Sequence, residues 1–143
     1  MITISTGIGR GQMEVLEHHV GLKKVIYKFY VELFKDKKGF TVFEVPNANY
    51  EANYWLSTIF NNSEVTNGIT RETLRVALEE ENIESRPLWK LMHFQPVFRH
   101  HPYYGKSVAA TLFETGLFLP SGCGLTQAEC DWIKDVVAKL FKK

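Results

Sequence analysis

The sequence predicts an α+β domain in which a small antiparallel or mixed sheet packs with helices, led by a long N-terminal helix. Three observations support this fold class. Residues 11–34 are largely free of helix breakers and carry apolar side chains at helical spacing. Two short runs rich in β-branched and aromatic residues follow, at 41–45 and 54–60. The second half of the chain shows three further helical patterns and one more short strand, at 116–120.

The first predicted helix has an apolar stripe that widens toward its C-terminal half. Residues three or four positions apart form the stripe, which consists of Met13, Leu16, Val20, Tyr27, Tyr30 and Phe34. Ile26, Phe29 and Leu33 widen it, so this end of the helix is expected to be buried on more than one side. Two interpretations remain open. The helix packs across the sheet, or it packs against a second body beyond these short strands.

The predicted strands are bounded by turn residues. DKKG at 36–39 ends the first helix, and Gly39 is suited to a left-handed conformation there. The strand at 41–45 is closed by Pro46, and the aromatic run YWLSTIF at 54–60 predicts a buried strand.

Three helices are predicted after these strands. The first begins at Thr70, runs to about Glu80 and has acidic Glu72 in its first turn. The second spans 107–115, ends at Gly116 and is expected to turn three apolar side chains inward, those of Val108, Leu112 and Phe113. The last starts with a capping box formed by Thr126 and Glu129. Its apolar face carries Trp132, Ile133, Val136, Val137, Leu140 and Phe141.

The segment ESRPLWKLMHFQPVFRHHPYYG, residues 84–105, is predicted to be irregular because its three prolines fix φ and disfavour helix at the preceding residues. It contains the side chains that a nucleotide or phosphosugar site needs: Arg86, Trp89, Lys90 and His93. Arginine and lysine suit phosphate, histidine can donate to it, and tryptophan offers a flat face for a ring. Either this is a surface loop with crowded polar groups, or it is a shaped site for an anionic ligand.

Length and charge exclude several classes of function. A chain of 143 residues is one domain by size. A net charge of +1 argues against nucleic-acid and membrane-surface partners. No apolar run approaches the roughly 18 residues of a membrane span, and the first residues lack the pattern of a signal peptide. We therefore expect a cytoplasmic protein in which Cys123 and Cys130 are reduced thiols.

Other motifs in the sequence give little support for a phosphate, metal or catalytic site. The G-x-G-x-G at 7–11 follows no predicted strand and lacks the spacing of a nucleotide-binding loop, so close packing of the helix start explains its small residues better. The adjacent histidine pairs at 18–19 and 100–101 lack further ligands at metal-binding spacing, and no metal is expected. No signature of a catalytic nucleophile is present.

Several segments resemble a known family in matching order and spacing. RPLWKLMHFQPVF at 86–98 resembles the RPLWKPMHLQPVF signature of the pyridoxal-phosphate-dependent nucleotide-sugar aminotransferases of the DegT type. GIGRGQMEVLEHHV at 7–20 resembles the family's GIGRGQMEVLDERV, and PYYG at 102–105 matches its PYYG. LFETGLFLPSGCGLT at 112–126 resembles LFERGLCLPSGSGLT. The most similar subgroup aminates a UDP-linked 4-keto-6-deoxy-N-acetylhexosamine.

The resemblance implies a fold type I enzyme that works as a homodimer, with a large cofactor domain followed by a small C-terminal domain. Residues 1–143 are expected to be the small domain only, without the large domain that carries the Schiff-base lysine. The intact enzyme would use pyridoxal phosphate to move an amino group from an amino-acid donor to a nucleotide-linked keto sugar. This chain alone is expected to hold no cofactor, to contain no catalytic residue, to be inactive and to self-associate through exposed apolar surface.

Carried over by the resemblance, Arg86, Trp89, Lys90 and His93 would contact the nucleotide sugar, at its diphosphate and sugar. Loop fixation is the competing interpretation, in which Arg86 holds Glu84 and Trp89 is a core residue. Leu91 departs from the family's proline, which puts the stiffness of the loop in doubt. An alternative function is a stand-alone nucleotide-sugar-binding or assembly module that complements a separate large domain. An inert folded product is a third possibility.

Overall fold

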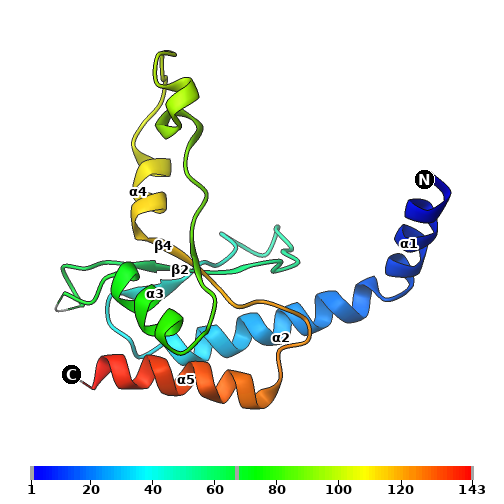
Figure 1. Cartoon of the computed structure of the whole chain (residues 1–143). Helices are drawn as coiled ribbons and strands as arrows, with labels where there is room; N and C mark the ends of the chain where they lie inside the picture. Colours follow the sequence, from blue (N-terminus) through cyan, green and yellow to red (C-terminus); the bar gives the residue numbers. More distant parts are fainter. Residues whose placement is uncertain (1, 67, 143) are drawn as a thin grey trace.

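The computed structural model describes residues 2–66 and 68–142, which form helices around a small sheet (Figure 1). The helices are α1 (Ile2–Glu14), α2 (Leu16–Phe34), α3 (Arg71–Glu80), α4 (Val108–Thr115) and α5 (Gln127–Phe141). The strands are β1 (Phe40–Val42), β2 (Ser57–Asn61), β3 (Arg86–Pro87) and β4 (Gly116–Leu119). Two short 3-10 turns are η1 (Met92–Phe94) and η2 (Pro96–Phe98). The predicted α+β class is confirmed.

The sheet is antiparallel, with strand order β1-β2-β4-β3. Its central pair places Ile59 opposite Leu117, and both side chains are fully buried. They join apolar side chains of α2, α3 and α5 in a single core. Because side chains alternate across a strand, Phe60 and Phe118 point to the opposite face, where both are only half-buried. This second face carries the candidate site described below.

The predicted first helix is two helices in the structure. A single helix was expected over residues 11–34. In the structure α1 already begins at Ile2, and the helix is interrupted at Val15 before α2 starts. The glycine-rich stretch thus lies inside α1, where the backbone N–H groups are used by the helix and cannot cradle a phosphate. Figure 1 shows α1 pointing away from the body of the domain.

The two halves of the predicted apolar stripe behave differently. In α2 the residues Ile26, Tyr30 and Phe34 are buried in the core, so this half packs across the sheet as one of the two interpretations expected. Met13 and Leu16, at the junction of the helices, are exposed. The helical periodicity was therefore right, but it did not distinguish buried from exposed apolar residues.

The strands lie where they were predicted but are shorter. β1 covers Phe40–Val42 rather than 41–45, and β2 begins at Ser57 rather than residue 54. The shortening of β2 has a local cause. Tyr54 has a left-handed φ of 49°, and the Asn53 side chain accepts a hydrogen bond from the Trp55 N–H at 3.0 Å, so the chain turns before the strand starts. Gly39 has the predicted positive φ, at 82°.

The predicted starts of α3 and α5 are confirmed by their caps. The Thr70 side chain accepts a hydrogen bond from the Thr73 N–H. Thr126 and Glu129 form the predicted capping box at the start of α5. Ile133, Val136 and Val137 of α5 are buried, whereas Trp132 lies at the edge of the predicted face and is exposed.

The prediction that α4 turns its apolar side chains inward is wrong. Val108 is 63% exposed, Leu112 is also exposed and Phe113 is half-buried. The reason is that α4 and the irregular segment before it form an arm that projects from the sheet, as Figure 1 shows. Arg71 stabilises the base of this arm, because its Nη1 donates hydrogen bonds to the backbone carbonyls of Phe113 and Gly116.

Within residues 2–66 and 68–142, none of the helices combines the length and apolar character that crossing a membrane requires.

Candidate substrate-binding site

The segment 84–105 is mostly irregular, as predicted, but its start joins the sheet. Arg86 pairs with Phe118 and Pro87 with Leu117 in the strand register. Proline is tolerated here because β3 is an edge strand. A two-residue strand leaves no detectable sequence pattern, so this element was not predicted. It fixes the backbone of Arg86 against β4.

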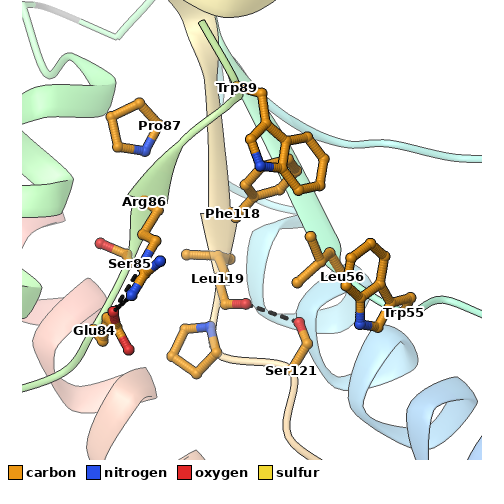
Figure 2. A pocket seen from close by; sticks show the side chains of 11 residues that line it. Trp55, Leu56, Glu84, Ser85, Arg86, Pro87, Trp89, Phe118, Leu119 and Ser121 are labelled. Atoms are coloured by element: carbon orange, nitrogen blue, oxygen red, sulfur yellow. Dashed lines mark hydrogen bonds and ion pairs between the residues drawn. The ribbon is translucent and has the colours of Figure 1, made fainter.

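A pocket of about 440 Å³ opens beside this edge of the sheet. Figure 2 shows the three segments that line it: residues 55–56 before β2, 84–89 around β3, and 118–121 at the end of β4. One wall is aromatic and the other carries the charged side chains of Arg86 and Glu84. A largely apolar cavity with a few convergent polar groups is the usual form of a small-molecule site.

Arg86 forms an exposed ion pair at this pocket. Its Nε donates to Glu84 Oε1 at 2.7 Å, and its Nη2 donates to the same oxygen. This is the contact expected if Arg86 only fixes the loop. Both side chains are about three-quarters exposed, and such pairs contribute only about 0–1 kcal/mol. An anionic ligand can therefore compete with Glu84 for the guanidinium.

Trp89 is not a core residue, contrary to one of the interpretations left open by the sequence. Its side chain is 67% exposed. The ring lies edge-on to Phe118, with centroids 4.7 Å apart, and is roughly parallel to Trp55 at 6.1 Å with an interplanar angle of 28°. Trp89 thus contacts both Phe118 of the sheet and the indole of Trp55, which is also exposed.

Lys90 and His93, the other two predicted site residues, do not line this pocket. Lys90 is exposed. His93 lies further along the arm, stacked on Tyr103 at 3.9 Å and edge-on to Phe94 at 4.4 Å. The structure therefore brings Arg86 and Trp89 to one cavity and places His93 in a separate aromatic cluster of the arm.

Sequence reasoning missed Trp55 and the residue that holds it. Lys23 of α2 donates from Nζ to the carbonyl of Trp55 at 3.2 Å and to the carbonyl of Ser121. This one ammonium group joins α2 to two of the three segments that line the pocket. The run YWLSTIF was interpreted as a buried strand, and nothing in that pattern indicated that Trp55 would be exposed.

Tyr27 of α2 supports the same region and predicts a pH dependence. Its ring stacks on Tyr54 at 3.9 Å, and burial raises the pKa of Tyr27 from 10.0 to about 12. Because the folded state disfavours the phenolate, this contribution to stability is complete below about pH 10 and is lost as pH rises toward 12. We expect Tyr27→Phe to weaken the alkaline loss of stability, measured as the urea midpoint from about pH 9 to about pH 12.

The matched control is Tyr104→Phe, because the Tyr104 side chain is 90% exposed. It should keep the pH dependence of the unchanged protein. Burial also raises the pKa of Tyr30, so part of the alkaline loss remains in both variants. An identical slope for Tyr27→Phe and Tyr104→Phe would contradict the prediction.

The model of the DegT/DnrJ/EryC1/StrS aminotransferase family matches residues 1–140. The chain belongs to this family. The match covers nearly all of the chain, including both tryptophans and Arg86 of the pocket.

Relatives of this aminotransferase family cover almost all of the chain. EpsN of Bacillus subtilis (strain 168), named as a pyridoxal phosphate-dependent aminotransferase, is 34% identical over 142 residues, which span 96% of this chain and 35% of EpsN. GDP-perosamine synthase of Caulobacter vibrioides is 26% identical over 92% of this chain and 35% of that protein. The chain therefore spans about a third of the length of these relatives.

A solved structure of a DegT DnrJ EryC1 StrS aminotransferase from Brucella abortus has the same fold. Its TM-score with this chain is 0.75 at 25% identity, covering 93% of this chain and 34% of that one. Members of the DegT family are pyridoxal-phosphate-dependent aminotransferases, and a pocket that held this cofactor covalently would need a lysine. The described residues that line the pocket of this chain include no lysine, and it offers no amine for covalent attachment. The pocket therefore does not fit covalently bound pyridoxal phosphate.

Proposed function

We propose that the chain is the small C-terminal domain of an aminotransferase that transfers an amino group from an amino-acid donor to a nucleotide-linked keto sugar. Membership of the family and the name of one relative, GDP-perosamine synthase, support a nucleotide-linked sugar as substrate. The observation that carries the proposal is the pocket, which combines an exposed guanidinium with exposed aromatic rings. These groups suit the diphosphate and the rings of such a substrate.

In this proposal the chain supplies one wall of the substrate site. Arg86 exchanges Glu84 for the diphosphate, and Trp89 contacts a ring of the substrate. Lys90 and His93 lie outside the pocket and contact a part of the substrate that extends along the arm. In the proposed enzyme the cofactor and the groups that move protons belong to a separate large domain, which is supported by the finding that the chain spans about 35% of its relatives.

Exposed apolar surface on α1 and on the arm supports packing against further protein. Ile4, Ile8 and Met13 of α1 are exposed, and side chains added at Gly7 or Gly11 would meet nothing within 4 Å. Ile4 and Ile8 lie one turn apart on the same face of α1, and apolar side chains exposed together in this way favour an interface. In the proposed enzyme these surfaces meet the large domain and the second subunit of a homodimer in the cytoplasm.

Incubation of the chain with pyridoxal phosphate, glutamate and a UDP-linked keto sugar is expected to give no amino sugar. Borohydride treatment followed by peptide mass mapping should show no single preferred lysine, since surface lysines react weakly and without selection. An adduct confined to one lysine, or amino transfer by the chain alone, would contradict the proposal.

The alternative, a binding or assembly module that complements a separately made large domain, shares the same pocket. The two proposals differ in how the cofactor domain is supplied. Fusion of that domain to this chain should restore amino transfer if the chain is part of one enzyme subunit. A module that works in trans should restore it when the two are only mixed.

A further inference from the structure

We propose that Lys23 of α2 is a positioning residue for the pocket, because it holds Trp55 in a fixed place relative to the end of β4. Lys23 is not among the described residues that line the pocket, so it acts through the residues whose carbonyls it binds. Its effect on the place of Trp55 is independent of any reaction. The consequence for substrate affinity rests on the proposed function.

The first argument is the point in the sheet at which Lys23 acts. At this end the last paired residues of β2 and β4 are Ser57 and Leu119. The same register would next bring Trp55 opposite Ser121, but β2 begins only at Ser57. The Lys23 ammonium group donates to the carbonyls of both residues of this unformed pair, to Trp55 at 3.2 Å and to Ser121. Because an ammonium group has three N–H donors, one side chain supplies the missing contact between the two strands.

The second argument is that the Ser121 side of this contact is held independently of the ammonium group. The Ser121 hydroxyl is buried and donates to the Leu119 carbonyl at 2.8 Å, as Figure 2 shows. Tyr30 of α2 donates from its hydroxyl to the carbonyl of the neighbouring Pro120 at 2.7 Å. The end of β4 is therefore a fixed reference point, and the ammonium group ties residues 55–56 to it.

The third argument is that the Trp55 side depends on this contact. The Trp55 side chain is 63% exposed, so packing restrains it little and the backbone decides where the indole lies. Tyr54, the preceding residue, has a φ of 49°, a conformation that bulky residues rarely adopt. The Trp55 N–H donates to the Asn53 side chain at 3.0 Å, and its carbonyl accepts from Lys23. Release of the carbonyl lets Tyr54 relax to an ordinary φ, which moves the indole away from Trp89, now 6.1 Å distant.

The next residue of α2 provides a matched control. Lys24 forms an ion pair with Glu51 at 2.7 Å and so binds the same loop before β2. The Glu51 side chain is exposed, and Glu51 is not among the described residues that line the pocket. Exposed pairs of this kind contribute little to stability. Lys24→Met therefore removes the same charge from the same helix and leaves the walls of the pocket untouched.

The first test follows the indole N–H resonances of the three tryptophans in two-dimensional NMR spectra of the full chain, assigned by replacing each tryptophan in turn. Trp132 lies on α5 outside the pocket and is the internal reference. In Lys23→Met we expect the Trp89 resonance to move toward its position in Trp55→Leu, because the ring current of the neighbouring indole is withdrawn. The Trp132 resonance should stay in place, and Lys24→Met should leave all three unchanged.

Lys23→Arg is the conservative variant, since it keeps the charge and the N–H donors. A planar guanidinium reaches two separate carbonyls less well than an ammonium group does. The Trp89 resonance of Lys23→Arg should therefore lie between those of the unchanged chain and Lys23→Met. Should Lys23→Met fail to fold, this variant still shows the displacement. A residue that only stabilised the fold would move no resonance until the chain unfolds.

The second test connects the place of Trp55 to the reaction, in a chimera in which residues 1–140 replace the matching part of EpsN. Lys23→Met should raise KM for the nucleotide-linked sugar about 10-fold, the factor that corresponds to one hydrogen bond to a charged group. We expect kcat and KM for the amino donor to stay the same, because the substrate wall moves and the reacting groups do not. Lys24→Met should keep KM for the sugar within about 2-fold.

Three outcomes would overturn the inference: an unmoved Trp89 resonance in Lys23→Met, an equal displacement of the Trp132 resonance, or the same KM for Lys23→Met and Lys24→Met in an active chimera. All three would leave the proposed function intact. An inactive chimera without substitutions would instead contradict the proposed function, and the NMR test would still decide whether Lys23 positions Trp55.

Discussion

Replacement of Phe34 by alanine is expected to lower the free energy of unfolding by about 3–5 kcal/mol. Phe34 is 2% exposed at the end of α2 and packs on Phe40 of β1, with ring centroids 5.6 Å apart. It therefore joins the longest buried helix to the first strand of the sheet. Truncation removes the transfer free energy of the ring and leaves a cavity that the sheet and α5 cannot fill by small shifts. Small domains are stable by only about 5–15 kcal/mol, so much of the stability would be lost.

The matched control is Val25→Ala on the same helix. Val25 is 64% exposed, and substitutions at such positions usually change stability by less than about 0.5 kcal/mol. Urea unfolding of both variants, followed by far-UV circular dichroism, compares them directly. A loss below about 1 kcal/mol for Phe34→Ala would mean that α2 does not pack on the sheet as described.

The elements that were predicted correctly are those whose signal is local. Capping residues at Thr70 and Thr126 and the positive φ of Gly39 each depend on neighbours within a few positions, and the structure confirms all three. Periodicity located α2 and α5 for the same reason. It also predicted a buried face for α4, which was wrong, because an apolar stripe shows that a surface needs covering but not what covers it.

The candidate site was predicted only in part, because only some of its residues lie close together in the sequence. Arg86 and Trp89 lie in one short segment with recognisable chemistry, and the structure places both at the pocket. Trp55 reaches the same pocket from a segment more than 30 residues earlier. Its backbone carbonyl accepts a hydrogen bond from Lys23, which also donates to a carbonyl 98 residues away in the sequence. Such contacts arise from the order of strands in the sheet. Such long-range contacts cannot be predicted from the spacing of residues in the sequence.

Arg86→Ala is expected to reduce amino transfer sharply when the chain works with a cofactor domain. A suitable protein is a chimera in which residues 1–140 replace the matching 35% of EpsN. Arg86 is the charged side chain of the pocket that can bind a diphosphate, and hydrogen bonds to charged groups contribute about 1.5–3 kcal/mol. We expect kcat/KM for the nucleotide-linked sugar to fall about 10-fold to 150-fold. KM for the amino donor should stay the same, because Arg86 is proposed to contact only the sugar nucleotide.

Two control variants separate this role from general effects of charge. Arg99→Ala removes an exposed arginine of the same irregular segment that lies outside the pocket, and kcat/KM should remain within about 2-fold. Glu84→Gln weakens the ion pair with Arg86 and frees the guanidinium, so KM for the sugar nucleotide should not rise. If Arg86→Ala and Arg99→Ala lowered kcat/KM equally, Arg86 would act only through the overall charge of the arm. If Glu84→Gln were as damaging as Arg86→Ala, the ion pair would serve to fix the loop, and the diphosphate would have to bind elsewhere.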